Sequence, residues 1–257
     1  MVRIHPWLKS NMEDLRDAVL HHDWDGLLIV DGMEGSGKST LAQQVAAVLD
    51  PEFHISKIVF TAEQFVKQVK IAKKGDCIVW DETDFQSSNV AMQQQKLLRR
   101  FLQVVRERNL FLILVAPYIF DLDKYIAVAR SRCLLHVFTQ GFTRGQFEFY
   151  GYNSKRVLYF LGKQRYWDYS VVKQDWKNPG WFEQGYMVDR ADYLAKKREA
   201  TARIASGDTD PFLARDRYIL KSKEVFKVSD EKLGEVFNLS KQRIGQIISR
   251  QASKENK

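Results

Sequence analysis

The amino-acid sequence predicts an α/β protein with a mostly parallel sheet, followed by a small module built only of helices. Three observations support this prediction. Short apolar runs alternate with helical patterns between residues 27 and 138, a glycine-rich turn joins the first run to a helix, and the end of the chain forms short basic helical patterns. Strands that alternate with helices are typical of a doubly wound parallel sheet.

Length and composition narrow the class of protein. The chain has 257 residues, 45% of them hydrophobic, and a formal net charge of +8. This composition suits one large domain with a small appendix and excludes wholesale disorder. The longest apolar run, residues 110–118, is far shorter than the roughly 18 residues of a membrane span, and the first residues lack a secretory signal. We therefore expect a soluble, cytoplasmic protein with no membrane partner, in which Cys77 and Cys133 lie in strands and imply no disulfide framework.

The elements are predicted in order from their own segments. A first helix is expected at residues 11–22, where apolar residues recur at helical spacing. Buried strands are expected at 27–31, 57–60, 76–80, 110–115 and 133–138, and helices between them at 38–49, 61–73, 90–108 and 122–129, with Thr61 as an N-cap. After a turn at 141–145, residues 146–152 alternate as an antiparallel strand does, whereas the aromatic-rich stretch 155–185 gives no assignment.

The chain is expected to divide into three parts. Residues 1–188 hold the α/β domain, residues 189–210 form a basic helix and a polar linker at 206–211, and residues 211–257 form the helical module. Much of the excess of lysine and arginine lies between residues 196 and 257. An appendix that binds nucleic acid often has this charge distribution, and a solvated cationic face has it too.

The glycine-rich turn matches the phosphate-loop pattern G-x-x-x-x-G-K-S/T, and it follows an apolar strand and opens a helix. In such a loop, backbone N–H groups and the helix N-terminus surround the phosphates of a nucleotide. The predicted nucleotide-binding residues are Gly32, Gly35, Ser36, Gly37, Lys38, Ser39 and Thr40. Lys38 is expected to reach the β- and γ-phosphates as a catalytic residue, and the Ser39 hydroxyl to bind Mg²⁺, so that ATP and Mg²⁺ are the expected ligands.

Asp81 and Glu82 form the matching acidic strand end. We expect Asp81 to hold Mg²⁺ and Glu82 to orient and deprotonate the attacking water. One strand, at 57–60, intervenes along the chain between the phosphate loop and this pair. The arrangement resembles the additional-strand, catalytic-glutamate class of P-loop ATPases more than the nucleotide kinases and GTPases, and this resemblance implies ATP hydrolysis coupled to mechanical work.

Arg130 and Arg132 bracket the step into the fifth predicted strand. In oligomeric ATPases an arginine from a neighbouring subunit stabilises charge on the transferring phosphoryl group. We therefore expect a homo-oligomer in which one of these two arginines acts as a catalytic residue in trans, whereas a surface arginine that is merely solvated is the plainer alternative.

The segments 106–117, 120–126, 130–132 and 134–137 resemble the ATPases of viruses and mobile elements related to zonula occludens toxin-like and HerA/FtsK-like proteins. The resemblance covers about residues 27–150. Such ATPases often carry a polar sensor at the end of the fourth strand, where this chain has Ala116 and Pro117, and the chain lacks the transmembrane segment of zonula occludens toxin-like proteins. The resemblance implies DNA replication, packaging or partition, in the host cytoplasm if the protein is viral.

Residues 231–248 resemble a helix-turn-helix. Gly234 permits close crossing of two helices, Asn238 lies at the turn, Ser240 caps the second helix, and Leu239, Ile244 and Ile247 face a small core. The residues left outward on the second helix suit phosphates and base edges, which makes DNA the expected partner of Lys241, Gln242, Arg243, Gln246 and Arg250. A helical hairpin that contacts other proteins is the alternative.

These patterns together predict a Mg-ATP-dependent, DNA-binding ATPase of viral or mobile-element type. Two other functions fit part of the sequence. The absence of a polar sensor at Ala116 and Pro117 suits a nucleotide-switched DNA-binding regulator without efficient turnover. The phosphate loop also resembles that of thymidylate kinases, so a nucleoside or nucleotide kinase is the second alternative.

Overall fold

The computed structural model describes residues 2–81, 89–205, 219–220, 222–223, 227–237 and 239–255. The chain divides into two compact units, Met1–Lys197 and Arg198–Lys257. The linker predicted at 206–211 lies outside the described residues, and the three-part division of the chain stays a prediction.

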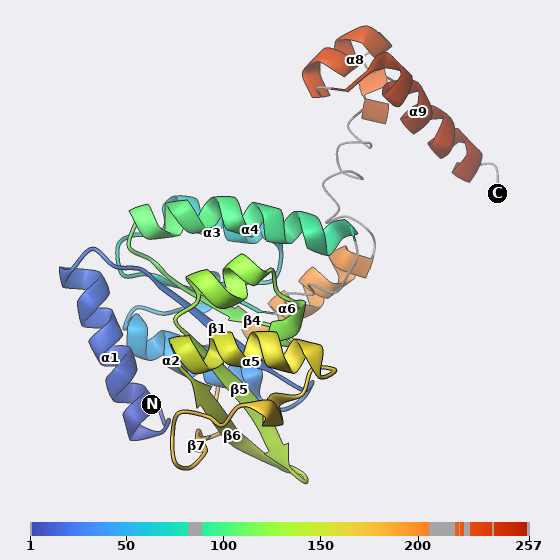
Figure 1. The fold of residues 1–257 in the computed structure, drawn as a ribbon. Coiled ribbons are helices and arrows are strands. Elements are labelled where there is room, and N and C mark those ends of the chain that lie inside the picture. Colours follow the sequence, from blue (N-terminus) through green and yellow to red (C-terminus); the bar gives the residue numbers. More distant parts are fainter. Residues whose placement is uncertain are drawn as a thin grey trace. The chain divides into compact units, whose positions relative to one another are not determined.

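The first unit is built on a seven-stranded sheet with the order β2-β3-β4-β1-β5-β6-β7 (Figure 1). Strands β1 to β5 pair in parallel, whereas β6 and β7 are antiparallel additions at one edge. The strands are β1 (Gly26–Gly32), β2 (Ile58–Val59), β3 (Cys77–Trp80), β4 (Phe111–Val115), β5 (Cys133–Gln140), β6 (Thr143–Tyr150) and β7 (Gly180–Trp181). The sheet is thus mostly parallel, as the sequence predicts.

One strand separates β1, which leads into the phosphate loop, from β3, which ends at the acidic pair. That strand is β4, because Leu27 pairs with Leu112 on one side of β4 and Ile78 pairs with Leu112 on the other. The strand that intervenes along the chain, β2, lies instead at the edge of the sheet beside β3. The strand inserted in space is therefore not the one inserted in sequence.

The helices of the first unit are α1 (Pro6–His21), α2 (Lys38–Leu49), α3 (Ala62–Ile71), α4 (Asn89–Glu107) and α5 (Tyr152–Gln164), and α6 (Arg190–Ala205) begins there. Helix α1 starts earlier than predicted, because Pro6 suits a first helical position and the His5 side chain accepts a hydrogen bond from the Trp7 N–H. The helix predicted at 122–129 is replaced by a 3₁₀ turn, Ile119–Asp121, and a π-helix, Tyr125–Arg130.

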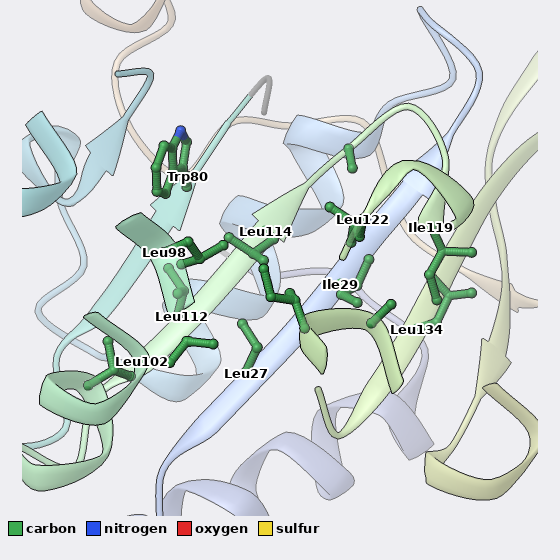
Figure 2. Packing of buried hydrophobic residues seen from close by; sticks show 14 of the residues in the cluster. Leu27, Ile29, Trp80, Leu98, Leu102, Leu112, Leu114, Ile119, Leu122 and Leu134 are labelled. Carbon is green, nitrogen blue, oxygen red and sulfur yellow. The ribbon is translucent and has the colours of Figure 1, made fainter. Parts of the chain in front are cut away.

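Helices cover both faces of the sheet (Figure 1). On one face α2 packs against β1, β3 and β4, and α1 packs against α2. On the other face the buried cluster shown in Figure 2 joins Leu27 and Ile29 of β1 and Leu112 and Leu114 of β4 to the helical Leu98. Alternate residues of each strand face opposite sides, so burial on both faces explains why these strands read as continuous apolar runs.

The chain after β5 forms the antiparallel edge of the sheet, and it includes the stretch 155–185 that the sequence left unassigned. A two-residue turn at Gly141 and Phe142 joins β5 to β6, and it is shorter than the turn predicted at 141–145. Helix α5, a 3₁₀ turn at Tyr169–Val171 and strand β7 follow. Trp176 stacks on Phe149 of β6 with ring centroids 4.8 Å apart.

The two cysteines are free thiols buried in the sheet, Cys77 in β3 and Cys133 in β5. Burial raises the pKa of Cys77 and raises that of Cys133 to about 12. Within the described residues, no helix is long and apolar enough to cross a membrane.

The second unit contains helices α8 (Asp230–Phe237) and α9 (Lys241–Glu255). They share a small buried cluster of Ile219, Leu233, Ile244 and Ile247, with Leu239 packed against it. A Cβ added to Gly234 would lie 2.6 Å from the Leu239 carbonyl oxygen, so the close crossing at Gly234 requires glycine. Asn238, predicted at the turn, lies outside the described residues.

Candidate nucleotide-binding site

The glycine loop follows β1 and wraps toward the start of α2. Gly35 and Gly37 have φ angles of 74° and 107°, which side-chain-bearing residues rarely adopt. Gly32 is more restricted still, because a Cβ there would lie 1.9 Å from the Val137 carbonyl oxygen of β5. The backbone path therefore requires both glycines of the phosphate-loop pattern, Gly32 and Gly37, and Gly35 as well.

The loop has polar groups that the protein itself leaves unused. The N-cap of α2 is Gly37, which has no side chain to cap the N–H groups of the first turn. Ser36 is 1% exposed, and its hydroxyl has no hydrogen-bond partner among the described residues. An unpaired buried hydroxyl beside a helix N-terminus fits an anion such as a phosphate. Thr40, the residue after the pattern, is buried in the first turn of α2.

Lys38 folds back over the loop. Its Nζ donates to the carbonyl oxygens of Gly32 at 2.6 Å and Met33 at 2.9 Å. The ammonium group thus lies over the loop where phosphates would enter, and it is held there by carbonyls with which a phosphate would compete.

Ser39 and Asp81, predicted to share a metal ion, lie side by side. The Ser39 hydroxyl donates to Asp81 Oδ1 at 3.0 Å, although the two residues come from α2 and the end of β3. Asp81 is fully buried, and its backbone N–H bonds to the Val59 carbonyl of β2. One carboxylate and one hydroxyl suit Mg²⁺, which takes only a few protein oxygens and completes its shell with phosphate oxygens and water. The described residues contain no group of three or more His, Cys, Asp or Glu side chains that could hold a metal by itself.

Tyr193 of α6 is a member of this cluster that the sequence did not reveal. Its hydroxyl donates to Asp81 Oδ2 at 2.6 Å. Burial raises the pKa of Tyr193, and the negative charge of Asp81 raises it further, so the phenol stays protonated and remains a donor. In the sequence, Tyr193 is one aromatic residue in a basic helical pattern, and nothing in that pattern connects it with Asp81.

Asp31, the residue before the loop, anchors it from beneath. This fully buried carboxylate accepts the Ile119 N–H at 2.8 Å and the Tyr169 hydroxyl, and it lies 2.8 Å from His136 Nδ1. The His136 and Tyr169 rings stack 3.7 Å apart. Burial and the Asp31 charge raise the pKa of Tyr169. The start of the loop is therefore fixed to β5, to the turn after β4 and to the segment after α5.

Arg130 and Arg132 lie at the other end of β1. Arg130 Nη2 is 2.5 Å from Asp25 Oδ2, and Arg132 donates to the Asp25 carbonyl while its guanidinium covers the Trp24 ring. Asp25 precedes β1 and the phosphate loop follows it, so the length of the strand, about 20 Å, separates these arginines from the loop. They do not reach the site of their own chain, and action in trans stays a prediction.

The other predicted site residues divide by what the structure describes. Glu82 lies outside the described residues, as does the side chain of Arg250. The remaining predicted DNA contacts, Lys241, Gln242, Arg243 and Gln246, are all exposed at the start of α9. Lys241 is paired with Glu231 of α8, and Arg243 donates to Gln246 at 3.1 Å.

Comparison with protein-family models and with curated proteins finds no match to the chain. Among solved structures, a RuvB variant from Thermotoga maritima is 14% identical with a TM-score of 0.37, over 93% of this chain and 83% of that one. The Aeropyrum pernix Orc1 protein in complex with DNA is 13% identical with a TM-score of 0.37, over 95% and 81%. DnaA from Aquifex aeolicus, bound to AMPPCP, is 10% identical with a TM-score of 0.32, over 95% and 87%. These likenesses are distant.

The class of fold therefore rests on the chain's own features. A mostly parallel sheet, a glycine loop between β1 and α2, and a buried aspartate at the end of β3 are together consistent with a P-loop NTPase fold.

Proposed function

We propose that the protein is a Mg-ATP-dependent ATPase that acts with DNA. The observation that carries this proposal is the meeting of the Ser39 hydroxyl with the buried Asp81 carboxylate, 3.0 Å apart, beside a glycine loop over which Lys38 folds. An incidental glycine-rich turn would not be expected to place a serine hydroxyl against a buried carboxylate at the end of a different strand.

Each residue has a defined task in this proposal. Backbone N–H groups of the loop and the Ser36 hydroxyl bind phosphate oxygens, and Lys38 exchanges its bonds to Gly32 and Met33 for the β- and γ-phosphates. Ser39 and Asp81 hold Mg²⁺, which when bound offsets the charge of the β- and γ-phosphate oxygens. Glu82 follows Asp81 directly and orients and deprotonates the attacking water.

The position of β4 between β1 and β3 supports the additional-strand, catalytic-glutamate class. We propose further that the second unit is a helix-turn-helix that binds DNA through exposed residues of α9, and that the protein forms homo-oligomers. Replication, packaging or partition of viral or mobile-element DNA, in the cytoplasm, is the setting that the sequence resemblance supports.

One observation favours a nucleotide-switched DNA-binding regulator as the second candidate. At the end of β4, where related ATPases often place a polar sensor, Pro117 accepts the Gly32 N–H through its backbone carbonyl at 3.1 Å. Neither Ala116 nor Pro117 has a polar side chain that could contact the γ-phosphate and sense its hydrolysis. Such a regulator would bind ATP and DNA with little turnover.

Steady-state ATP hydrolysis with and without DNA, at low and high salt, tests the proposal. We expect turnover that DNA stimulates and salt suppresses. Lys38→Ala should abolish turnover, whereas Lys67→Ala, which removes an exposed lysine of α3, should not. Glu82→Gln should abolish turnover and still bind ATP. Absence of turnover in the unaltered protein, with ATP and DNA binding intact, would leave the regulator as the function.

A further inference from the structure

A third arginine, Arg144, lies beside the phosphate loop. It is the second residue of β6, close to the turn of the β5–β6 hairpin, and it is exposed. Gln140 pairs with Thr143 just before it, and the carbonyl of Gly145 just after it accepts the Phe182 N–H at 2.8 Å. Backbone hydrogen bonds on both sides therefore fix where the Arg144 side chain starts.

Gly145 makes this arrangement specific. Its φ angle is 99°, and a Cβ there would lie 2.5 Å from the Phe182 carbonyl oxygen. Only glycine adopts this backbone without strain. The main chain beside Arg144 is consequently packed closely against the backbone of Phe182.

The Arg144 guanidinium reaches the middle of the phosphate loop. A Cβ built on Gly35 would lie 3.8 Å from Arg144 Nη2. Apart from the chain neighbours of Gly35, no other described atom comes within 4 Å of that position. The space above Gly35 is thus bounded by an arginine and is otherwise open.

Arg144 also differs from the arginines that the sequence singled out. Arg130 and Arg132 are bound to Asp25 at the far end of β1. Among the described residues, Arg144 has no hydrogen-bond or ion-pair partner, and no carboxylate holds it in place. Arg144 thus adds positive charge close to the start of α2 and to the unpaired Ser36 hydroxyl.

We propose that Arg144 binds the phosphate chain of the nucleotide from within the same subunit. This proposal rests on the proposed function, because it requires that the loop bind a nucleotide. Planar guanidinium groups bind phosphate oxygens through paired N–H donors, and these charge-assisted bonds are among the stronger ones. The arginine that completes the site of this chain is then supplied in cis by the β5–β6 hairpin.

Equilibrium binding of ATP and ADP to the full chain, without Mg²⁺ and without turnover, tests the proposal. Arg144→Ala is expected to weaken the binding of both nucleotides about tenfold or more, which is the loss of one charge-assisted hydrogen bond. Arg144→Lys should restore part of the affinity, since it keeps the charge and loses the paired donors. Arg156→Ala is the matched control, because Arg156 carries the same charge but stacks over Tyr152 of α5.

The outcomes separate this proposal from the one on which it rests. If the unaltered protein binds neither nucleotide, the proposed function fails. If it binds both and Lys38→Ala weakens them, but Arg144→Ala binds as the unaltered protein does, the role of Arg144 is refuted and the nucleotide site stands. An equal loss in Arg156→Ala would also refute it, because only net charge would then matter.

Discussion

Asp81 is held by hydroxyl groups on both carboxylate oxygens, Ser39 on Oδ1 and Tyr193 on Oδ2. A buried carboxylate is costly unless it is paired or hydrogen-bonded. These two hydroxyl groups satisfy hydrogen-bonding capacity on both oxygens of the Asp81 carboxylate. We expect a metal ion that binds to Asp81 to compete with the Tyr193 hydroxyl of α6.

Replacing Tyr193 with Phe tests this competition. Without nucleotide, the free energy of unfolding of the variant should be lower by about 1.5 to 3 kcal/mol, because the buried Asp81 carboxylate loses a hydrogen-bond donor. It should also need less Mg²⁺ for half-maximal ATP binding, since the hydroxyl no longer competes. Urea unfolding and a Mg²⁺ titration measure the two effects.

Tyr186→Phe is the control for that change, because the Tyr186 ring lies 5.0 Å from the Tyr193 ring. It removes a neighbouring tyrosine hydroxyl and keeps the hydrogen bond from Tyr193 to Asp81. Destabilisation of Tyr193→Phe with an unchanged Mg²⁺ requirement would show that the hydroxyl stays on Asp81 when the metal binds.

Lys155 gives the fold a pH dependence. Its buried Nζ donates to the carbonyl oxygens of Ala127 and Ser131 and to the Ser131 hydroxyl. Burial lowers the pKa of Lys155 from 10.5 to about 8. Above about pH 8 the folded protein releases this proton while the unfolded chain keeps it, so stability rises with pH.

The expected gain from Lys155 between pH 8 and about pH 9.5 is about 1.5 kcal/mol. Lys155→Met should remove it, so the stability difference between the two proteins must change across this range when urea unfolding is measured at each pH. A constant difference would mean that Lys155 keeps an ordinary pKa. Higher pH is avoided because unfolded tyrosines begin to ionise there.

At the scale of elements, α3 shows how local sequence sets a helix end. The Thr61 hydroxyl accepts the Gln64 N–H at 3.2 Å, and the Gln64 side chain accepts the Phe60 N–H at 2.9 Å. The predicted N-cap is confirmed, and the reciprocal bond resembles a capping box.

Thr61→Ala is expected to lower the free energy of unfolding by about 1 kcal/mol, because a helix N–H loses its acceptor. Thr61→Ser keeps the hydroxyl and should retain most of that stability in the same urea titration. If serine proved as costly as alanine, buried packing of the threonine methyl group would be the cause instead of the cap.

Elements bounded by clear signals could be predicted from the sequence, and α5 could not. The five parallel strands are apolar runs that end at turns, and α2 begins directly after Gly37. On α5, however, the buried side includes Lys155 and Gly162, while Val157 and Phe160 are exposed. Because a charged residue and a glycine face the core and apolar residues face outward, the helical period of hydrophobicity is lost.

The same limit applies to the candidate site. The loop and Asp81 are recognisable because their residues follow a fixed pattern along the chain. Tyr193 and Arg144 reach the loop only through the packing of α6 and through the pairing of the sheet edge, which no local pattern encodes. Conversely, Arg130 and Arg132 stand at a suggestive place in the sequence, but Arg130 pairs with the Asp25 carboxylate and Arg132 bonds to the Asp25 carbonyl.

At the scale of the whole molecule, the two compact units have separate cores. The second unit depends on a small cluster that includes Ile244 and Leu233. A core of this size has little stability to lose. Ile244→Ala, which typically costs about 2 to 5 kcal/mol, should therefore unfold the second unit.

We expect Ile244→Ala to lose DNA binding and to bind ATP as the unaltered protein does, because the loop lies in the first unit. Fluorescence anisotropy with labelled DNA and with labelled ATP measures both. A parallel loss of ATP binding would show that the two units fold as one. Val236→Ala is the matched control, because Val236 of α8 is exposed and its truncation spares the core.

Because both thiols are buried in the sheet, their reactivity reports local unfolding of the sheet. The chain contains two cysteines, Cys77 in a strand beside β4 and Cys133 in a strand beside β1. Thiol reagents react with exposed thiolates, so neither residue should be alkylated until its strand separates from its neighbours. The alkylation rate of each cysteine, measured by mass spectrometry of its peptide, then gives the rate at which that part of the sheet opens. A single cysteine placed on the surface could also carry a dye while the native pair stays in place.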